Sequence, residues 1–215
     1  MTNHERTPPT ANKIPGSATQ AVETNPFSTC CIRPGAVPFL FSPDGDARQL
    51  IARLRESAWW GQIVGEHGSG KSTLLQTLRP LLAEAGRQVE LYVLHAGQTR
   101  VPFAQNAPRQ WTADTQVVID GYEQLGWHVR RRLQRQCRTS QAGLLVTAHR
   151  RLRLPVLWQT QPTVALAQAV VAQLLTPQHR QIVTAEDVSR AFAAQGGNLR
   201  ETLFALYDVF AARRP

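Results

Sequence analysis

Lysine is almost absent from this chain of 215 residues, because Lys13 and Lys71 are its only lysines and every other basic residue is arginine. Acidic residues are also missing from one long stretch, since no Asp or Glu occurs between Gln124 and Ala185. Nine arginines lie in that stretch, which matches the excess charge of +9 of the whole chain. Such a one-sided distribution suits an anionic partner.

The acid-free stretch leaves the nature of that partner open. A run of arginines between Arg130 and Arg153 fits nucleic acid, a membrane surface or an acidic protein, and it fits equally well a solvated helix face in a protein biased towards arginine. The nine arginines are Arg130, Arg131, Arg132, Arg135, Arg138, Arg150, Arg151, Arg153 and Arg180. We therefore expect a possible anionic partner, nucleic acid or acidic protein, at Arg130–Arg153.

Cysteines and long apolar runs are scarce. Cys30 and Cys31 are adjacent and Cys137 stands alone, a spacing that matches neither a disulfide framework nor a zinc site. No apolar run approaches the roughly twenty residues that cross a bilayer, and the polar N-terminus lacks the apolar segment of a signal peptide. We expect free thiols, no transmembrane segment and a cytoplasmic location.

One of the two lysines, Lys71, lies in a glycine-rich stretch whose pattern requires a lysine at that position. The run Gly65-Glu66-His67-Gly68-Ser69-Gly70-Lys71-Ser72, followed by Thr73, fits the P-loop pattern G-x-x-x-x-G-K-[ST]. An apolar strand at 60–64 precedes it and an apolar helix follows it. In such a loop the backbone N–H groups and the helix dipole face phosphate oxygens. Lys71 would reach the β- and γ-phosphates and Ser72 would bind Mg²⁺. The sequence predicts a nucleoside triphosphate site.

Four further side chains lie at or just after the ends of buried strands at the same predicted sheet edge. Asp120 ends the strand 116–120, where an acid can hold the Mg²⁺ that Ser72 contacts. Glu123 is the nearest acid that could orient the attacking water, although an acid in the first turn of a helix also has a structural role. Thr147 and His149 follow the next strand and are candidates for a hydrogen bond to the γ-phosphate.

Strands alternate with helices up to about residue 160, and only helices follow. We therefore predict an α/β fold, a parallel-sheet P-loop NTPase core with a small C-terminal helical lid. The predicted parts are a disordered tail at 1–25, the core at 26–160 and the lid at 161–215. The expected strands are 60–64, 88–95, 116–120, 143–147 and a short one within 154–159. The expected helices are 47–58, 71–84, 122–139, 163–175, a helix capped by Thr184, and 198–212. Residues 25–41 are expected to be extended and 96–115 to form a loop.

Taken together, these motifs resemble the AAA+ superfamily of P-loop ATPases, over about residues 25–212. The resemblance rests on the P-loop, on the strand that ends at Asp120, and on Gly196-Gly197-Asn198-Leu199-Arg200-Glu201. It implies that Arg200 contacts the γ-phosphate and couples the lid to the nucleotide. It also implies a γ-phosphate sensor at Thr147, an adenine pocket lined by Val37, Pro38 and Phe39, and ATP rather than GTP.

The sequence departs from that family in two places that bear on catalysis. Gly121 stands where the family has a glutamate beside the metal-binding acid. Only residues 148–153 separate two predicted strands, which leaves no room for the helix that carries the arginine finger in oligomers. We expect an ATPase that uses Mg²⁺ to drive or gate a conformational change. The alternatives are a nucleotide-gated switch or adaptor with little hydrolysis, and a nucleic-acid-associated ATPase; an oligomer is possible.

Overall fold

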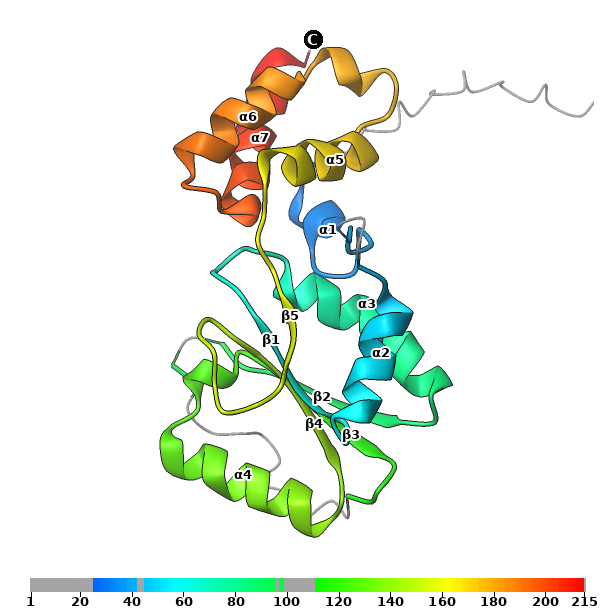
Figure 1. Ribbon diagram of the computed structural model, residues 1–215. Coiled ribbons are helices and arrows are strands. Elements are labelled where there is room, and N and C mark those ends of the chain that lie inside the picture. Colours follow the sequence, from blue (N-terminus) through cyan, green and yellow to red (C-terminus); the bar gives the residue numbers. More distant parts are fainter. Residues whose placement is uncertain (1–24, 42–44, 96, 99–110, 215) are drawn as a thin grey trace, which may run out of the picture.

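The core of the protein is a five-stranded sheet in which every strand runs parallel to its neighbours (Figure 1). The computed structural model describes residues 25–41, 45–95, 97–98 and 111–214, so the predicted tail and most of the predicted loop lie outside the described residues. The strand order is β2-β3-β4-β1-β5. The strands are β1 Trp60–Val64, β2 Gln88–Val93, β3 Thr115–Asp120, β4 Gly143–Ala148 and β5 Val156–Gln159. The predicted α/β class is confirmed.

Helices cover both faces of the sheet (Figure 1). On one face α2 (Ala47–Glu56) and α3 (Lys71–Glu84) pack on alternate strand residues such as Val118 and Leu145. On the other face α4 (Trp127–Thr139) packs through Leu133 and Cys137 on the strand residues that point the opposite way, such as Ile119 and Leu144. Because both faces are covered, the central strands β3 and β4 are buried almost throughout, as their continuous apolar runs predict.

The predicted helix over residues 122–139 is wrong as a single element. The chain forms a short 3₁₀ turn, η2 (Tyr122–Gln124), breaks at Leu125 and Gly126, and begins α4 at Trp127. Gly121 before the turn has φ +84°, and a side chain there would lie 2.6 Å from the carbonyl oxygen of Leu94. The break lets Leu125 turn into the core, where it is buried. A hydrophobic period alone does not reveal such a break.

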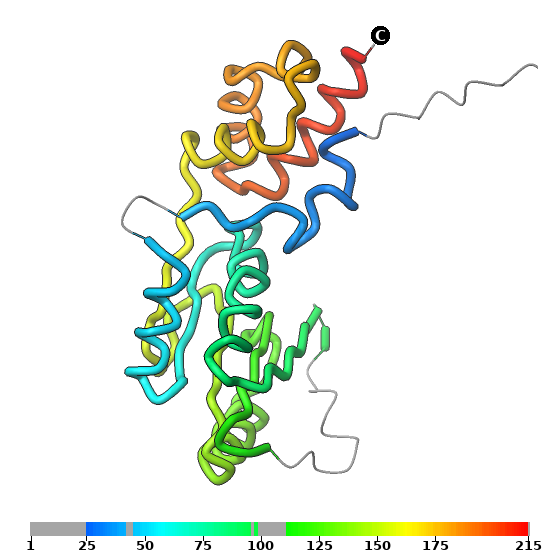
Figure 2. The backbone as a smooth tube through the Cα atoms, turned by 90° about the vertical axis from the view of Figure 1, so that its right-hand side faces the viewer, coloured from blue at the N-terminus to red at the C-terminus, as the bar shows by residue number. Residues whose placement is uncertain are grey.

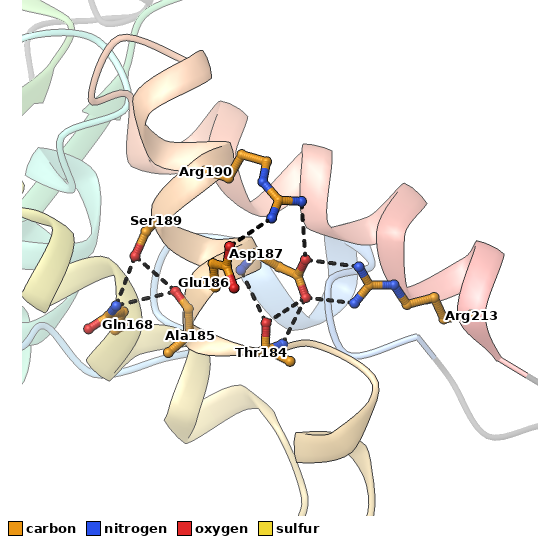
Figure 3. Close-up of polar contacts among 8 residues, drawn as sticks. All are labelled: Gln168, Thr184, Ala185, Glu186, Asp187, Ser189, Arg190 and Arg213. Carbon is orange, nitrogen blue, oxygen red and sulfur yellow. Dashed lines mark hydrogen bonds and ion pairs between the residues drawn. The ribbon is translucent and has the colours of Figure 1, made fainter.

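The C-terminal lid consists of α5 (Val164–Leu174), the 3₁₀ turn η3 (His179–Gln181), α6 (Ala185–Ala194) and α7 (Leu199–Arg213). A side-chain oxygen caps the N-terminus of each α-helix: those of Thr163, Thr184 and Asn198. Figure 3 shows how Asp187 of α6 accepts hydrogen bonds from Thr184 and from the guanidinium of Arg213 on α7. These contacts join two lid helices around one carboxylate.

The first described residues pack with the lid rather than with the sheet (Figure 2). Phe27 is fully buried in the lid core, with its ring edge-on to Phe210. Asn25 Nδ2 donates to the carbonyl oxygen of Tyr207 over 3.0 Å. Residues 25–41 are predicted to be extended throughout, and this prediction is wrong for Thr29–Ile32, which form the short helix α1.

Two sequence-based expectations concern thiols and membranes. All three cysteines are free thiols, and burial raises the pKa of Cys137 to about 12. No helix in the described ranges has the length and apolar character that crossing a bilayer requires.

Candidate functional site

The P-loop connects β1 to α3 and holds Lys71 in a buried position. The lysine is 8% exposed, and its Nζ donates to the carbonyl oxygens of Gly65 over 2.8 Å and Glu66 over 2.7 Å. Burial lowers the pKa of Lys71, and the nearby carboxylates of Glu123 and Asp120 oppose that shift. A buried ammonium held by the carbonyls of its own loop is poised to exchange those contacts for phosphate oxygens.

The glycines of the loop are required because other groups approach them closely. A methyl group on Gly65 would lie 2.0 Å from Thr160 Oγ1, and one on Gly68 would lie 1.8 Å from Asn198 Oδ1. Thr160, directly after β5, also shares a 2.6 Å hydrogen bond with Ser69 Oγ. The loop is therefore packed between the end of β5 and the first turn of α7, and Gly68 is a point of contact between core and lid.

Asp120 and Thr147 lie together at the carboxyl ends of neighbouring strands. Thr147 is fully buried, and its hydroxyl donates to Asp120 Oδ1 over 2.7 Å. The same hydroxyl accepts a hydrogen bond from the backbone N–H of Gly121 over 2.8 Å. Thr147 thus orients the carboxylate of Asp120, while its predicted contact with the γ-phosphate stays a prediction.

Glu123 lies in η2, across from the end of β4. Its Oε1 is 2.9 Å from Nε2 of His149, and the ring of His149 packs edge-on against that of His67, with centroids 3.7 Å apart. Burial lowers the pKa of His149, opposed by the negative charge of Glu123. The second oxygen of Glu123, Oε2, is buried and has no hydrogen-bond partner among the described residues.

The donor set fits ATP with Mg²⁺. In the part of the chain that the structure describes, no group of three or more His, Cys, Asp or Glu could hold a metal ion by itself. Mg²⁺ needs no such group, because one or two protein oxygens, water and substrate phosphates complete its octahedron. The Ser72 hydroxyl at the start of α3 and the Asp120 carboxylate, which the Thr147 hydroxyl already orients, are oxygen donors of that kind.

Of the residues assigned to the lid contact and the adenine pocket by resemblance, Phe39 is the one that the described contacts place beside the P-loop. Arg200 is exposed, and its guanidinium lies 5.5 Å from the ring centroid of Phe204 on its own helix. Phe39 lies beside the P-loop, because a methyl group added to Gly70 would be 3.4 Å from its ring. Pro38 is exposed and Val37 is half-buried. Their roles towards a nucleotide stay predictions.

The arginines between Arg130 and Arg153 do not form one surface. Arg130 turns inward and donates to the backbone oxygens of Leu125 and Glu123 over 2.7 and 2.8 Å. Arg151, after β4, donates to Gln159. The exposed members on α4 are Arg131, Arg132, Arg135 and Arg138. Arg131 stacks over Trp127, whose side chain is itself 61% exposed.

Sequence reasoning missed three contributors to the site. Thr160 follows a strand at the carboxyl edge of the sheet, so its position was a usable signal. Asn198 was part of the quoted motif, but only the folded chain brings its side chain against Gly68. The contact between His67 and His149 joins residues that lie far apart in sequence, and no local pattern predicts it.

Comparison with known proteins agrees with this architecture. No protein-family model and no curated protein matches the chain. Among solved structures, NtrX from Brucella abortus, determined in complex with ATP, matches with a TM-score of 0.54 at 13% sequence identity. The two proteins therefore share an α/β fold, which agrees with the five-stranded parallel sheet and its flanking helices. The match covers 82% of this chain and 51% of NtrX, so the chain spans about half the length of that structure, and at this identity the likeness concerns the fold alone.

Proposed function

We propose that this chain binds ATP with Mg²⁺ at its P-loop and hydrolyses it to drive or gate a movement of the lid, in the cytoplasm. The observation that supports this most is the convergence of a buried Lys71, an oriented Asp120 and a half-buried Glu123 at one edge of the sheet. Burial lowers the pKa of Lys71, and the carboxylates of Glu123 and Asp120 lie close enough to oppose that shift. In this proposal residues 26–160 form the NTPase core and 161–215 the lid, with Phe27 packed into the lid.

Each residue has a defined task in the reaction. Lys71 exchanges its carbonyl contacts for the β- and γ-phosphates, and Ser72 and Asp120 would hold the Mg²⁺, which would neutralise charge on the phosphates. Glu123 accepts a proton from water as its oxygen bonds to the γ-phosphorus. The bond to the bridging oxygen breaks, and ADP leaves with that electron pair, giving ADP and inorganic phosphate. Arg200 would contact the γ-phosphate from α7.

Turnover by the purified full chain tests this function. We expect Mg²⁺-dependent phosphate release from ATP that Lys71→Ala abolishes and that Glu123→Gln lowers roughly 100-fold, as for loss of a general base. Binding of a fluorescent ATP analogue should survive Glu123→Gln and fail in Lys71→Ala. Binding without release above the Lys71→Ala background would instead favour the nucleotide-gated switch or adaptor. Absence of both would contradict the proposal.

The face of α4 supports a second function, association with nucleic acid. Trp127, Arg131, Arg135 and Arg138 recur at the spacing of one helical face, and α4 contains no acid. The exposed Trp127 beside cationic groups suits a base stacked next to its phosphates. An acidic protein would satisfy the arginines but would make no comparable use of an exposed indole.

Binding of labelled oligonucleotides at several salt concentrations tests this second function. Arg131→Ala with Arg135→Ala should lower the slope of log K against log salt by about 1.4 on a single strand, at about 0.7 per lost phosphate contact. The matched control is Arg48→Ala with Arg79→Ala, which removes the same charge from exposed positions on α2 and α3. An equal effect of both pairs, or no salt dependence, would contradict nucleic-acid binding at α4.

A further inference from the structure

His149 contacts two residues of the site: His67 in the P-loop and the carboxylate of Glu123. It follows β4, and its Nε2 lies 2.9 Å from Oε1 of Glu123. On its other side the ring of His67 packs at a centroid distance of 3.7 Å with an interplanar angle of 68°. About a quarter of the side chain of each of His149 and Glu123 is exposed, so the pair is largely shielded from solvent.

The two oxygens of Glu123 have unequal surroundings. Oε1 is paired with His149, whereas Oε2 is buried without a hydrogen-bond partner among the described residues. A buried carboxylate oxygen without a donor is unfavourable unless water or a ligand supplies one. The pairing therefore fixes the orientation of the carboxylate and leaves one oxygen available for a donor that arrives from outside the protein.

We propose that His149 is a positioning residue for ATP hydrolysis, which holds Glu123 through Oε1 so that Oε2 receives the attacking water. This inference rests on the proposed hydrolysis. It explains how a glutamate three residues after Asp120, rather than beside it, is held in place: the imidazole of His149 compensates for the glycine at position 121.

The contact does not require His149 to be charged. Nε2 donates in the imidazolium and also in the neutral tautomer that carries its proton on Nε2. The charged and titratable groups that act on the ring are Glu123, Lys71, His67 and Glu66. Burial lowers the pKa of His149, so the neutral form dominates at neutral pH, and Nε2 lies 2.9 Å from Oε1 of Glu123.

His67 extends this arrangement into the P-loop. It is the residue before Gly68, and its ring supports the face of the His149 ring. His149 is therefore held between a residue of the P-loop and the carboxylate of Glu123.

A double-mutant cycle in the full chain tests the proposal. The variants are His149→Leu, Glu123→Gln and both together, with His149→Gln to restore an N–H donor. His95→Leu is the matched control, because His95 is exposed and follows the edge strand β2. We expect His149→Leu to lower kcat about tenfold, as a displaced catalytic group does, with affinity for ATP analogue unchanged. His149→Gln should recover part of the rate, and His95→Leu should match the wild type.

The decisive result is non-additivity. If His149 acts only through Glu123, His149→Leu should have no further effect on kcat in the Glu123→Gln background, within about twofold. Multiplying effects, or an unchanged kcat in His149→Leu, would overturn the proposal while leaving the ATPase intact. A wild type that releases no phosphate above Lys71→Ala would overturn both. Equal thermal unfolding of His149→Gln and wild type separates positioning from misfolding.

Discussion

The hydroxyl of Thr147 makes two hydrogen bonds in the described geometry, donating its proton to Asp120 and accepting from the backbone N–H of Gly121. Its neighbour Asp120 was predictable from the sequence, since an acid at the end of a buried strand meets the P-loop at the carboxyl edge of a parallel sheet. The hydrogen bond between the two was not predictable, because it depends on β3 and β4 being adjacent, which is a property of strand order.

Replacing Thr147 by Val should free the carboxylate of Asp120 and leave the backbone N–H of Gly121 without its acceptor. A buried polar group that loses its partner costs about 1–3 kcal/mol, so thermal unfolding should shift down. ATP turnover should need more Mg²⁺ than in the wild type, because the carboxylate is no longer held in place. Thr147→Ser keeps the hydroxyl and is the control; if Ser and Val variants behave alike, the hydrogen bond has no such role.

At the scale of elements, the sequence predicts a helix most accurately where a local motif marks the residue at which the helix begins. The P-loop lysine begins α3 and the predicted range 71–84 agrees with the observed helix. The capping box of Thr184 and Asp187 likewise fixes the start of α6. The interruption at Leu125 and the short helix α1 have no such signal: burial of Leu125 against the sheet and packing of 25–32 on the lid decide them.

Gly68 gives a prediction about the contact between the P-loop and α7. Gly68→Ala should displace the N-terminus of α7, because the new methyl group would overlap Asn198 Oδ1, and the affinity for ATP should fall. Gly86→Ala is the matched control: Gly86 also has a positive φ, of +81° against +68°, but no atom lies within 4 Å of its methyl position. Both variants lose about 1–2 kcal/mol of stability from the backbone. Equal ATP affinities of the two variants would show that the contact with Asn198 is unimportant.

Asp187 gives a prediction about pH. Hydrogen bonds from Arg213, and to a lesser degree from Thr184, hold the pKa of Asp187 well below the usual range of an aspartate. Since the folded-state pKa is depressed, its contribution to stability is present above the unfolded-state value and is lost as pH falls through the folded-state value. Asp187→Asn should destabilise α6 and α7 at pH 7, by roughly 2 kcal/mol for a cap and a charged hydrogen bond. It should also flatten the decline of stability below about pH 4.

Unfolding monitored over pH 2–8 measures both parts of this prediction for Asp187. Glu186→Gln is the control, because Glu186 precedes Asp187 in the same turn and pairs only with the exposed Arg190 among its described contacts. If stability declines equally steeply with acid in Asp187→Asn and in the wild type, the decline is caused by other carboxylates.

At the scale of the whole molecule, the first and the last described segments share one hydrophobic core. Phe27, Phe210 and Leu206 are buried together, so the start of the described chain completes the lid. The sequence places an order boundary near Asn25 but gives no indication that the following residues belong with helices more than a hundred residues away. Contacts of that range depend on the assembled fold and leave no periodic signal.

Phe27→Ala should therefore destabilise the lid rather than the sheet. Loss of a buried phenylalanine costs about 3–5 kcal/mol, and hydrogen exchange should rise in α5–α7 while β3 and β4 stay protected. Tyr207→Ala is the control, because Tyr207 is 41% exposed on the same helix as Phe210. Faster exchange throughout the sheet in Phe27→Ala would show that lid and core unfold as one unit.

The packing of Phe27 in the lid limits how the lid can move. The lid is joined to the rest in two ways: covalently, by the segment after β5 that leads into α5, and through the packing of Phe27, whose chain continues past Gln76 and Gly70 towards α2. A body tethered at a single point can swing in any direction, but one tethered at two points turns about the line that joins them. In the proposed movement the lid should therefore rotate about that line, so that each cycle returns Asn198 to its contact with Gly68.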